Sequence, residues 1–509
     1  MSQPGLPAPN APLAAVDMGS NSFRVEIARL VRGRYERLHY TKETVRLGAG
    51  LDANGLLGDD AAERGLACLR RFAAHLEGLA PLQVRAVATQ TLREAKNRDA
   101  FLLRAQAALG HPIEVISGRE EARLIYAGVA HLQPSERTRL VVDIGGRSTE
   151  MILGRGSTPI RAESFSVGSV SLSLRHFGDG LLTAQAFRAA QVAAGAELEE
   201  ALQPFAPAQW EEALGSSGTA GAVSQLLAAL GHRDGIITPD RLRMLIERCI
   251  EAGHVERLEL PGLKADRKPV IAGGLALLYT LAAQFGITRL APAKGALRQG
   301  VIVELHERLA AQRRHDGVPP VDRRDATVRD IQRRFQVDTA QAARVREVAL
   351  ALYAGLAADD DEGLRELGWA ADLHEIGLAI SHHDHHRHSA YLVGHLDAPA
   401  FSQTQQRHLA SVVLAQRGGL RKVEAQMTDR RYVHQVLALR LAVIKCHARG
   451  SVDAAALRLS FDGRDRARLH FSAAWAESHP RTLYLFEQES EAWSRSGVFA
   501  VGLATEPAV

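Results

Sequence analysis

One short motif occurs twice in this chain of 509 residues, and it constrains the fold more than any other feature. Residues 15–22 have the sequence AVDMGSNS, and residues 141–148 have the sequence VVDIGGRS. An alternating run follows each copy, at residues 23–27 and 149–153. This order predicts a strand, a tight turn and a second strand. Two unrelated turns could explain either copy alone, because Asp and Gly are common turn residues. Matching strands on both sides of both copies favour a duplicated domain.

The composition of the two turns predicts what they bind. Glycine and serine allow backbone N–H groups to face an anion, and the Asp at the start of each turn can hold a cation above it. Two such turns facing each other would clamp a phosphate group.

The segments around the motif predict alternating strands and helices. In the first half we expect a third strand at residues 35–40 and a helix over residues 61–79, followed by further strands and helices. The further predicted elements are strands at 84–88 and 113–116, a helix ending at residue 109, a helix over 120–130, strand-to-helix junctions at 215–219 and 270–278, and a helix that follows residues 294–300 and ends at residue 309. The sequence therefore predicts an α/β fold with domain I at residues 13–126, domain II at residues 127–305 and a cleft between them.

The rest of the chain divides by composition and periodicity. Residues 1–12 are rich in proline and predict a disordered tail, and residues 306–324 are charged and contain prolines, which predicts a linker. Residues 325–450 carry apolar side chains at helical intervals. Residues 451–509 alternate at 456–461, 467–471 and 483–486, which predicts strands in a small α+β domain.

Bulk properties narrow the class of protein. A hydrophobic content of 46% and a charged content of 24% are typical of a soluble globular protein. The formal net charge of +4 and a pI of about 9.0 suit a polyanionic partner, with no requirement for nucleic acid. The 3 cysteines include Cys68 and Cys446, neither of which lies in a C-x-x-C spacing, so we expect a reducing, cytoplasmic compartment. We expect neither a signal peptide nor a membrane span.

Three further segments each allow two interpretations. Glu120 and Glu121 begin a predicted helix, where carboxylates favour the helix dipole, but one of them could also be a general base that activates water. Arg93 follows a buried strand, so it is either a solvated helix residue or a bidentate phosphate ligand. Residues 215–219 form either a flexible turn or an anion site at a helix N-terminus.

Histidines gather in the predicted helical region. An adjacent His-Asp pair on a helix would indicate a metal-dependent phosphohydrolase, but here Glu375 follows His374 in the position of the Asp. Residues 382–388 have the sequence HHDHHRH, and such clusters can bind Zn or Ni. We prefer a loop of partly protonated, solvated histidines without a native metal.

Taken together, these motifs resemble the exopolyphosphatase/guanosine pentaphosphate phosphohydrolase family, within the sugar kinase/Hsp70/actin superfamily. The resemblance covers nearly the whole chain, which is similar to the long, four-domain form of the family. The segments that carry it are residues 16–23, 91–95, 117–126, 143–146, 148–150, 217–219, 295–300, 369–377 and 386–391.

The resemblance implies a set of site residues. Glu121 would be the base that activates water, and Arg93 would neutralise developing charge. Mg²⁺ would be held by Asp143 and Glu150, with Asp17 on the opposite wall. The phosphate-binding residues expected from the turns and the resemblance are Ser20, Asn21, Ser22, Gly145, Gly146, Arg147, Ser148, Ser217, Gly218 and Thr219.

The resemblance also implies an activity. We expect an Mg²⁺-dependent exopolyphosphatase that releases orthophosphate processively from the ends of inorganic polyphosphate. Residues 325–450 would be an HD-like domain that has lost its His-Asp pair, extends a basic channel along the polymer and contributes to a homodimer. Peripheral association with the inner face of the cell membrane is compatible with this expectation.

One residue departs from the family pattern and keeps alternatives open. The second turn usually has three consecutive glycines, and here Arg147 takes the third position, where it could crowd the phosphate or contact it. Two other functions therefore stand beside the exopolyphosphatase. One is a guanosine pentaphosphate 5′-phosphohydrolase, and the other is a polyphosphate-binding regulatory protein with weak turnover.

Overall fold

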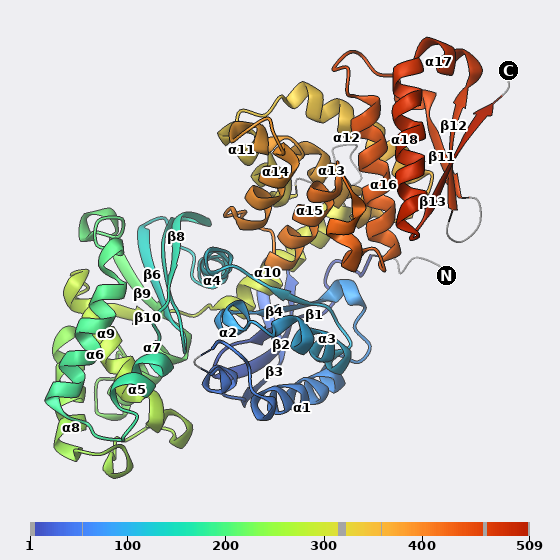
Figure 1. Ribbon diagram of the computed structural model, residues 1–509. Coiled ribbons are helices and arrows are strands. Elements are labelled where there is room, and N and C mark those ends of the chain that lie inside the picture. The colour runs from blue at the N-terminus through green and yellow to red at the C-terminus, as the bar shows by residue number, and fades with distance from the viewer. Residues whose placement is uncertain (1–5, 53, 314–321, 358, 462–465, 507–509) are drawn as a thin grey trace. The chain divides into compact units, whose positions relative to one another are not determined.

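The computed structural model describes residues 6–52, 54–313, 322–357, 359–461 and 466–506, and it divides the chain into two compact units (Figure 1). The first unit is Met1–Pro320 and the second is Val321–Val509. Parts of the predicted tail, residues 1–5, and of the predicted linker, residues 314–321, lie outside the described residues.

The first unit contains two lobes with the same strand order. The first sheet has the order β3-β2-β1-β4-β5, and the second has the corresponding order β8-β7-β6-β9-β10. In each sheet the three strands that come first in the chain pair with one another in antiparallel fashion. The two later strands run parallel to the central strand, which is β1 in the first sheet and β6 in the second. The strands are β1 (Leu13–Met18), β2 (Ser22–Val31), β3 (Arg34–Thr44), β4 (Val84–Ala88), β5 (Ile113–Val115), β6 (Thr138–Ile144), β7 (Thr149–Arg155), β8 (Thr158–Phe165), β9 (Glu212–Ser216) and β10 (Leu290–Pro292). The predicted duplication of an α/β domain is confirmed.

Helices cover the two sheets (Figure 1). In the first lobe, helix α1 packs one apolar face into the core. The buried residues of this face recur at helical intervals and include Leu66, Leu69, Phe72 and Leu76. The helices of this unit are α1 (Asp59–Leu76), α2 (Gln90–Glu94), α3 (Arg98–Leu109), α4 (Gly118–Leu132), α5 (Ser169–His176), α6 (Ala184–Glu197), α7 (Ser217–Ala229), α8 (Pro239–Ala252), α9 (Ile271–Gln284) and α10 (Leu297–Arg313).

Helices α4 and α10 pack against each other between the two sheets, and α4 also contacts β7 and β8 while α10 contacts β1. Side chains from both lobes meet around them in one apolar core, which includes Ala15, Ile125, Val141 and Val301. The two helices approach so closely that a Cβ on Gly300 would lie 1.8 Å from the Leu124 carbonyl oxygen. A shared core of this kind fixes the lobes on either side of a common cleft.

The second unit joins a set of helices to a small sheet over one apolar core, in which Trp369 and Trp493 are fully buried. The helical character predicted for residues 325–450 is confirmed. The sheet has the order β11-β12-β13. The elements of this unit are α11 (Arg323–Arg334), α12 (Thr339–Ala354), α13 (Asp361–Leu373), α14 (His385–His395), α15 (Gln403–Ala415), α16 (Arg430–Lys445), β11 (Arg458–Phe461), β12 (Arg466–Ser472), α17 (Ala473–Ser478), α18 (Pro480–Ser496) and β13 (Ala500–Glu506).

Three local predictions differ from the structure. The strand-to-helix junction predicted at residues 270–278 contains no strand, because residues 271–278 belong to helix α9. Residues 306–313, at the start of the predicted linker, continue helix α10. The strand predicted at residues 483–486 is wrong, because this segment lies in α18, which buries Phe486, Glu489 and Trp493 at helical spacing. The third strand of the small sheet is instead β13.

No helix within the described ranges is long and apolar enough to span a bilayer.

Candidate active site

The two copies of the motif form equivalent turns in the two lobes. Asp17 and Asp143 each lie one residue before the end of the central strand of their sheet. Each turn closes tightly, because a Cβ on Gly19 would lie 3.1 Å from the Ser22 carbonyl oxygen, and a Cβ on Gly145 would lie 3.1 Å from the Ser148 carbonyl oxygen. The close approach of each turn therefore favours glycine at this position.

The two copies differ in the residue that faces the Asp across the strand pair. Asp17 is paired with Arg24, which donates a hydrogen bond to it at 3.2 Å, whereas Asp143 is paired with Glu150. Residues directly opposite each other point to the same face of a sheet. The first turn thus has a neutralised carboxylate, and the second has a pair of carboxylates.

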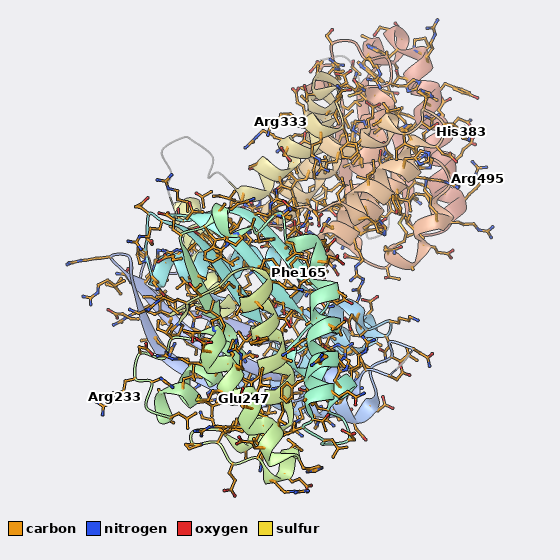
Figure 2. All side chains as sticks on the ribbon, turned by 90° about the vertical axis from the view of Figure 1, so that its left-hand side faces the viewer. Phe165, Arg233, Glu247, Arg333, His383 and Arg495 are labelled. Carbon is orange, nitrogen blue, oxygen red and sulfur yellow. The ribbon has the colours of Figure 1, made fainter. Side chains whose placement is uncertain are left out.

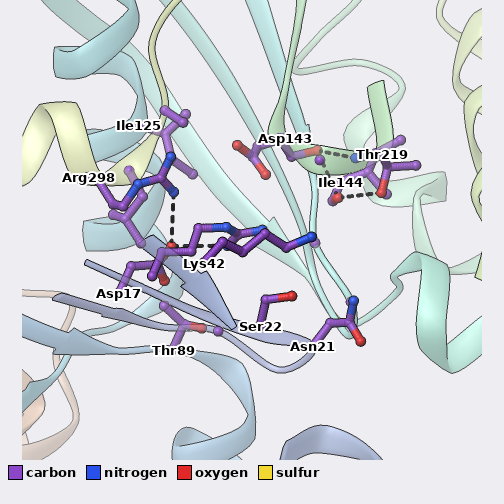
Figure 3. Close-up of a pocket in the computed structure, with 18 of the residues that line it drawn as sticks. Asp17, Asn21, Ser22, Lys42, Thr89, Ile125, Asp143, Ile144, Thr219 and Arg298 are labelled. Carbon is purple, nitrogen blue, oxygen red and sulfur yellow. Dashed lines mark hydrogen bonds and ion pairs between the residues drawn. The ribbon is translucent and has the colours of Figure 1, made fainter. Parts of the chain in front are cut away.

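A cavity of about 320 Å³ lies between the two turns. Figure 3 shows Asp17 and Asp143 on opposite sides of it, with Arg298 joined to Asp17. The predicted site residues that line it are Asp17, Ser20, Asn21, Ser22, Glu121, Asp143, Gly145, Gly146, Ser148, Ser217, Gly218 and Thr219. The fold therefore brings most of the predicted phosphate-binding residues to one cavity.

Glu121 reaches this cavity from the first turn of α4, where the Ser117 hydroxyl accepts a hydrogen bond from the Glu120 N–H and caps the helix. The Arg93 guanidinium donates a hydrogen bond to the Glu121 carboxylate, with an Nη1–Oε2 distance of 2.7 Å. Burial raises the pKa of Glu121, and Asp17 adds to the shift, while Arg93 opposes it. A buried carboxylate with a raised pKa that faces a polar cavity has the properties of a general base.

Burial, and to a lesser extent like charge, raises the pKa values of the two paired carboxylates in the second lobe. Burial raises the pKa of Asp143 to about 7, with contributions from Glu121 and Asp17, and the Ser216 hydroxyl opposes it. Burial, Glu121 and Asp143 raise the pKa of Glu150 well above its ordinary value. A cation near these two carboxylates would relieve this repulsion.

The carboxylates of Asp143 and Glu150 fit a magnesium ion that keeps some of its coordination positions for water and substrate. Among the described residues, no group of three or more His, Cys, Asp or Glu side chains is arranged to hold a metal ion. Mg²⁺ is commonly bound through one or two carboxylates together with substrate phosphates. Asp143 and Glu150 provide two such carboxylates, whereas Asp17 is already paired with Arg24 and Arg298.

The glycine-serine segment beside the second turn forms the N-terminus of α7. Ser217 and Thr219 donate their hydroxyls to the Ile144 carbonyl oxygen, both at 2.9 Å, so these side chains fasten the segment to the end of β6. On the first turn, Ser20 accepts a hydrogen bond from Thr91, while the buried Ser22 hydroxyl has no hydrogen-bond partner among the described residues. Ser22 also lines the cavity, so its hydroxyl suits a ligand there.

The cavity also has a basic wall that the sequence analysis did not assign. Its cationic side chains come from β2, β3, α10 and the segments before α9 and α10. Burial and the positive charge of Arg267 lower the pKa of Lys42, and burial and the positive charge of Arg24 lower the pKa of Arg267. Such crowding favours a polyanionic ligand. The wall consists of Arg24, Arg37, Lys42, Arg267, Lys294 and Arg298.

Three predicted site residues do not line the cavity. Glu150 lies opposite Asp143 on the neighbouring strand β7 and accepts a hydrogen bond from Ser164 at 2.8 Å. Arg93 lies behind Glu121, and Arg147 forms an ion pair with Glu94 at 2.8 Å. The two arginines can therefore act through the residues that they contact, whereas Glu150 is placed to share a cation with Asp143.

The histidine run of the second unit is partly buried. His382 and His383 are exposed, and Figure 2 shows His383 projecting from the surface, but His385 and His386 are buried at the start of α14. The prediction of a solvated loop is therefore wrong for His385 and His386, because α14 packs against α15 and the segment after α13.

Comparison with known proteins agrees with this architecture. The Ppx/GppA phosphatase family matches residues 26–309, and domain III of that family matches residues 323–490. A guanosine-5′-triphosphate,3′-diphosphate pyrophosphatase of Pseudoalteromonas atlantica is 36% identical over 493 residues, which cover 95% of each chain.

Solved structures give the fold of the first unit. An exopolyphosphatase-like protein is 26% identical with a TM-score of 0.53 over 59% of this chain and 100% of the other. An exopolyphosphatase from Cytophaga hutchinsonii is 23% identical with a TM-score of 0.53 over 58% of this chain and 98% of the other, which supports the fold alone. The predicted fold class, duplicated actin-like α/β domains followed by a helical region, is confirmed. The chain belongs to the Ppx/GppA phosphatase family.

Proposed function

We propose that this protein hydrolyses the terminal 5′ phosphoanhydride bond of guanosine 5′-triphosphate 3′-diphosphate, with Glu121 as the general base. The observation that carries the proposal is the placement of the buried Glu121 carboxylate on the same cavity as two glycine-serine turns and a basic wall. The turns suit the phosphoryl group under attack, and the wall suits further phosphates of the substrate.

The relative from Pseudoalteromonas atlantica favours the nucleotide over the polymer that the sequence analysis preferred. Its name specifies this nucleotide, and the similarity extends over 95% of both chains. The basic wall suits either polyanion, so the choice of the nucleotide rests on this relative.

The chain's own residues account for the proposed reaction as follows. Glu121 accepts a proton from a water molecule as the water oxygen attacks the terminal phosphorus. The bond between this phosphorus and the bridging oxygen breaks, so that orthophosphate and guanosine 5′-diphosphate 3′-diphosphate are released. Backbone N–H groups of the two turns would hold the oxygens of the transferred phosphoryl group, and Ser22 would donate its free hydroxyl.

Asp143 and Glu150 would hold Mg²⁺ on the second turn. When bound, the ion would neutralise charge on the phosphate oxygens. Asp17, which is paired with two arginines, would then position Arg298 on the opposite wall. Arg93 would hold the Glu121 carboxylate in place.

The proposal is tested by comparing two substrates under the same conditions. Purified protein is assayed for phosphate release from guanosine 5′-triphosphate 3′-diphosphate and from long-chain inorganic polyphosphate in the presence of Mg²⁺. We expect the higher kcat/KM for the nucleotide. A higher kcat/KM for the polymer would contradict the proposal.

An exopolyphosphatase is the second candidate, because the exopolyphosphatase-like protein of known structure is 26% identical to this chain. The third alternative, a regulatory protein with weak turnover, rests on the presence of Arg147 on the second turn. The ion pair of Arg147 with Glu94 directs its guanidinium away from the cavity, which favours turnover over binding alone. Dimerisation and peripheral membrane association remain predictions from the sequence.

A further inference from the structure

Arg147 connects the turn of the second lobe to the first lobe. Its guanidinium donates to the Glu94 carboxylate from Nη2 at 2.8 Å and from Nε at 3.1 Å, and Nη1 donates to the Gly48 carbonyl oxygen at 3.3 Å. The side chain passes so close to Gly48 that a Cβ there would lie 2.8 Å from the Arg147 Cδ atom. Arg147 is thus held by the first lobe on two sides.

The hydrogen bonds continue from Glu94 into helix α2. The other carboxylate oxygen of Glu94 accepts a hydrogen bond from the Gln90 side-chain amide at 2.5 Å. Because the amide nitrogen of Gln90 faces Glu94, its oxygen faces Arg93, from which it accepts hydrogen bonds at 2.6 Å and 3.0 Å. Gln90 is buried, so few other orientations are open to it.

Arg93 links this series to the candidate base. Two of its nitrogens are held by Gln90, and the third donates to the Glu121 carboxylate at 2.7 Å and to the Ile116 carbonyl oxygen at 3.1 Å. A continuous hydrogen-bond chain therefore runs from Arg147 on the second turn to Glu121 on the cavity. Its members, in order, are Arg147, Glu94, Gln90, Arg93 and Glu121.

We propose that Arg147 is a positioning residue for Glu121, acting through Glu94, Gln90 and Arg93. This inference rests on the proposed function of Glu121. Without Arg147, the half-exposed Glu94 carboxylate is free to turn toward solvent, and Gln90 loses the partner that fixes its amide. Arg93 then holds Glu121 less firmly, and a small displacement of a catalytic group lowers the rate of the chemical step.

Kinetics of Arg147→Gln and Gln90→Met provide the test. Gln90→Met interrupts the chain but leaves the ion pair between the lobes. We expect each substitution to lower kcat by about 10–100-fold with KM little changed. Because both act through one series of contacts, the double variant should be no slower than Gln90→Met alone. Arg147→Lys should recover part of the activity, since it restores a charged partner for Glu94.

Arg241→Gln is the matched control. Arg241 also donates to one carboxylate, Asp234 at 2.7 Å, and to one backbone carbonyl, that of Ile236 at 2.6 Å, and it lies in the second lobe outside the cavity. This variant should keep the wild-type kcat.

Crystal structures of Arg147→Gln and Gln90→Met give a second result that does not depend on any substrate. We expect the Arg93–Glu121 contact to lengthen or to become disordered in both. An unchanged contact, additive losses in the double variant, or a wild-type kcat in Arg147→Gln would each overturn the inference. Wild-type protein that releases no phosphate would refute the proposed function instead, and the structures would still test the positioning role.

Discussion

Replacing Asp143 by Asn should stabilise the first unit, and the gain should depend on pH. The Asp143 carboxyl has a pKa of about 7 in the folded protein, against an ordinary value of 3.8, because it is buried near other carboxylates. A pKa that is raised on folding means that the folded state binds the proton more tightly. Stability is therefore highest below the ordinary pKa and is lost as the pH rises toward 7.

The size of the effect follows from the shift. Three pKa units correspond to about 4 kcal/mol of unfolding free energy. An Asn side chain carries no charge at any pH, so the variant should exceed the wild type by about 1.5 kcal/mol at pH 5 and by about 4 kcal/mol at pH 8 in the absence of divalent ions. Added Mg²⁺ should narrow the difference at pH 8 if Asp143 holds the ion.

Buried thiols allow the two units to be measured separately. Cys68 and Cys249 lie in the cores of the two lobes and Cys446 in the second unit, and all three are buried and free. Labelling of each thiol is followed against denaturant concentration by peptide mass spectrometry. Asp143→Asn should raise the denaturant concentration at which Cys249 and Cys68 are half labelled, whereas the corresponding concentration for Cys446 should stay constant.

The matched control for this experiment is Asp240→Asn, since the Asp240 side chain is 87% exposed. It should change stability by no more than about 0.5 kcal/mol at either pH. A gain for Asp143→Asn that is equal at pH 5 and pH 8, or no gain at all, would refute the reasoning that like charge and burial strain this carboxylate.

Three further predictions follow from the structure. Gly300→Ala adds a methyl group where α4 and α10 meet and should lower the free energy of unfolding by about 1–3 kcal/mol. The denaturant midpoints for labelling of Cys68 and Cys249 should then fall, and unchanged midpoints would show that the helices tolerate the group. Glu304→Gln weakens a buried network with Arg85 and Arg123 and should cost about 3–5 kcal/mol at pH 7. Since these arginines lower the pKa of Glu304, the destabilisation caused by Glu304→Gln should become smaller as the pH falls below the ordinary pKa of 4.5. A destabilisation that does not change with pH would contradict the ion pairing of Glu304. Chelation of divalent ions should abolish phosphate release and added Mg²⁺ should restore it, so release that persists in excess chelator would argue against a metal on Asp143 and Glu150.

The part of the fold that the sequence predicted correctly depends on local patterns. The repeated Asp-x-Gly turn predicted both sheets, because strand alternation and turn glycines are properties of adjacent residues. The same turns supplied most of the residues that line the cavity. Residues 483–486 were misassigned because four alternating residues fit a strand as well as a helix, and only the burial of Trp493 together with Phe486 decides between them.

The remaining part of the site depends on contacts between distant residues. Lys42 and Arg267 belong to different lobes, and each looks like a solvated residue in its own segment. The two turns share the same strand register, and they differ because Arg24 lies opposite Asp17 whereas Glu150 lies opposite Asp143. Arg147 could be recognised in the sequence as a departure from glycine, but its partner Glu94 lies 53 residues away.

The central claim is that Glu121 activates water in the cleft between the two turns, and steady-state phosphate release by the wild type and by Glu121→Gln tests it most directly. Both proteins are assayed on guanosine 5′-triphosphate 3′-diphosphate with Mg²⁺ at pH 8. The amide can still accept a hydrogen bond from Arg93 but is not a base. We predict that kcat falls by about 10²–10⁴-fold while KM changes little. A Glu121→Gln protein that releases phosphate at the wild-type rate would contradict the account.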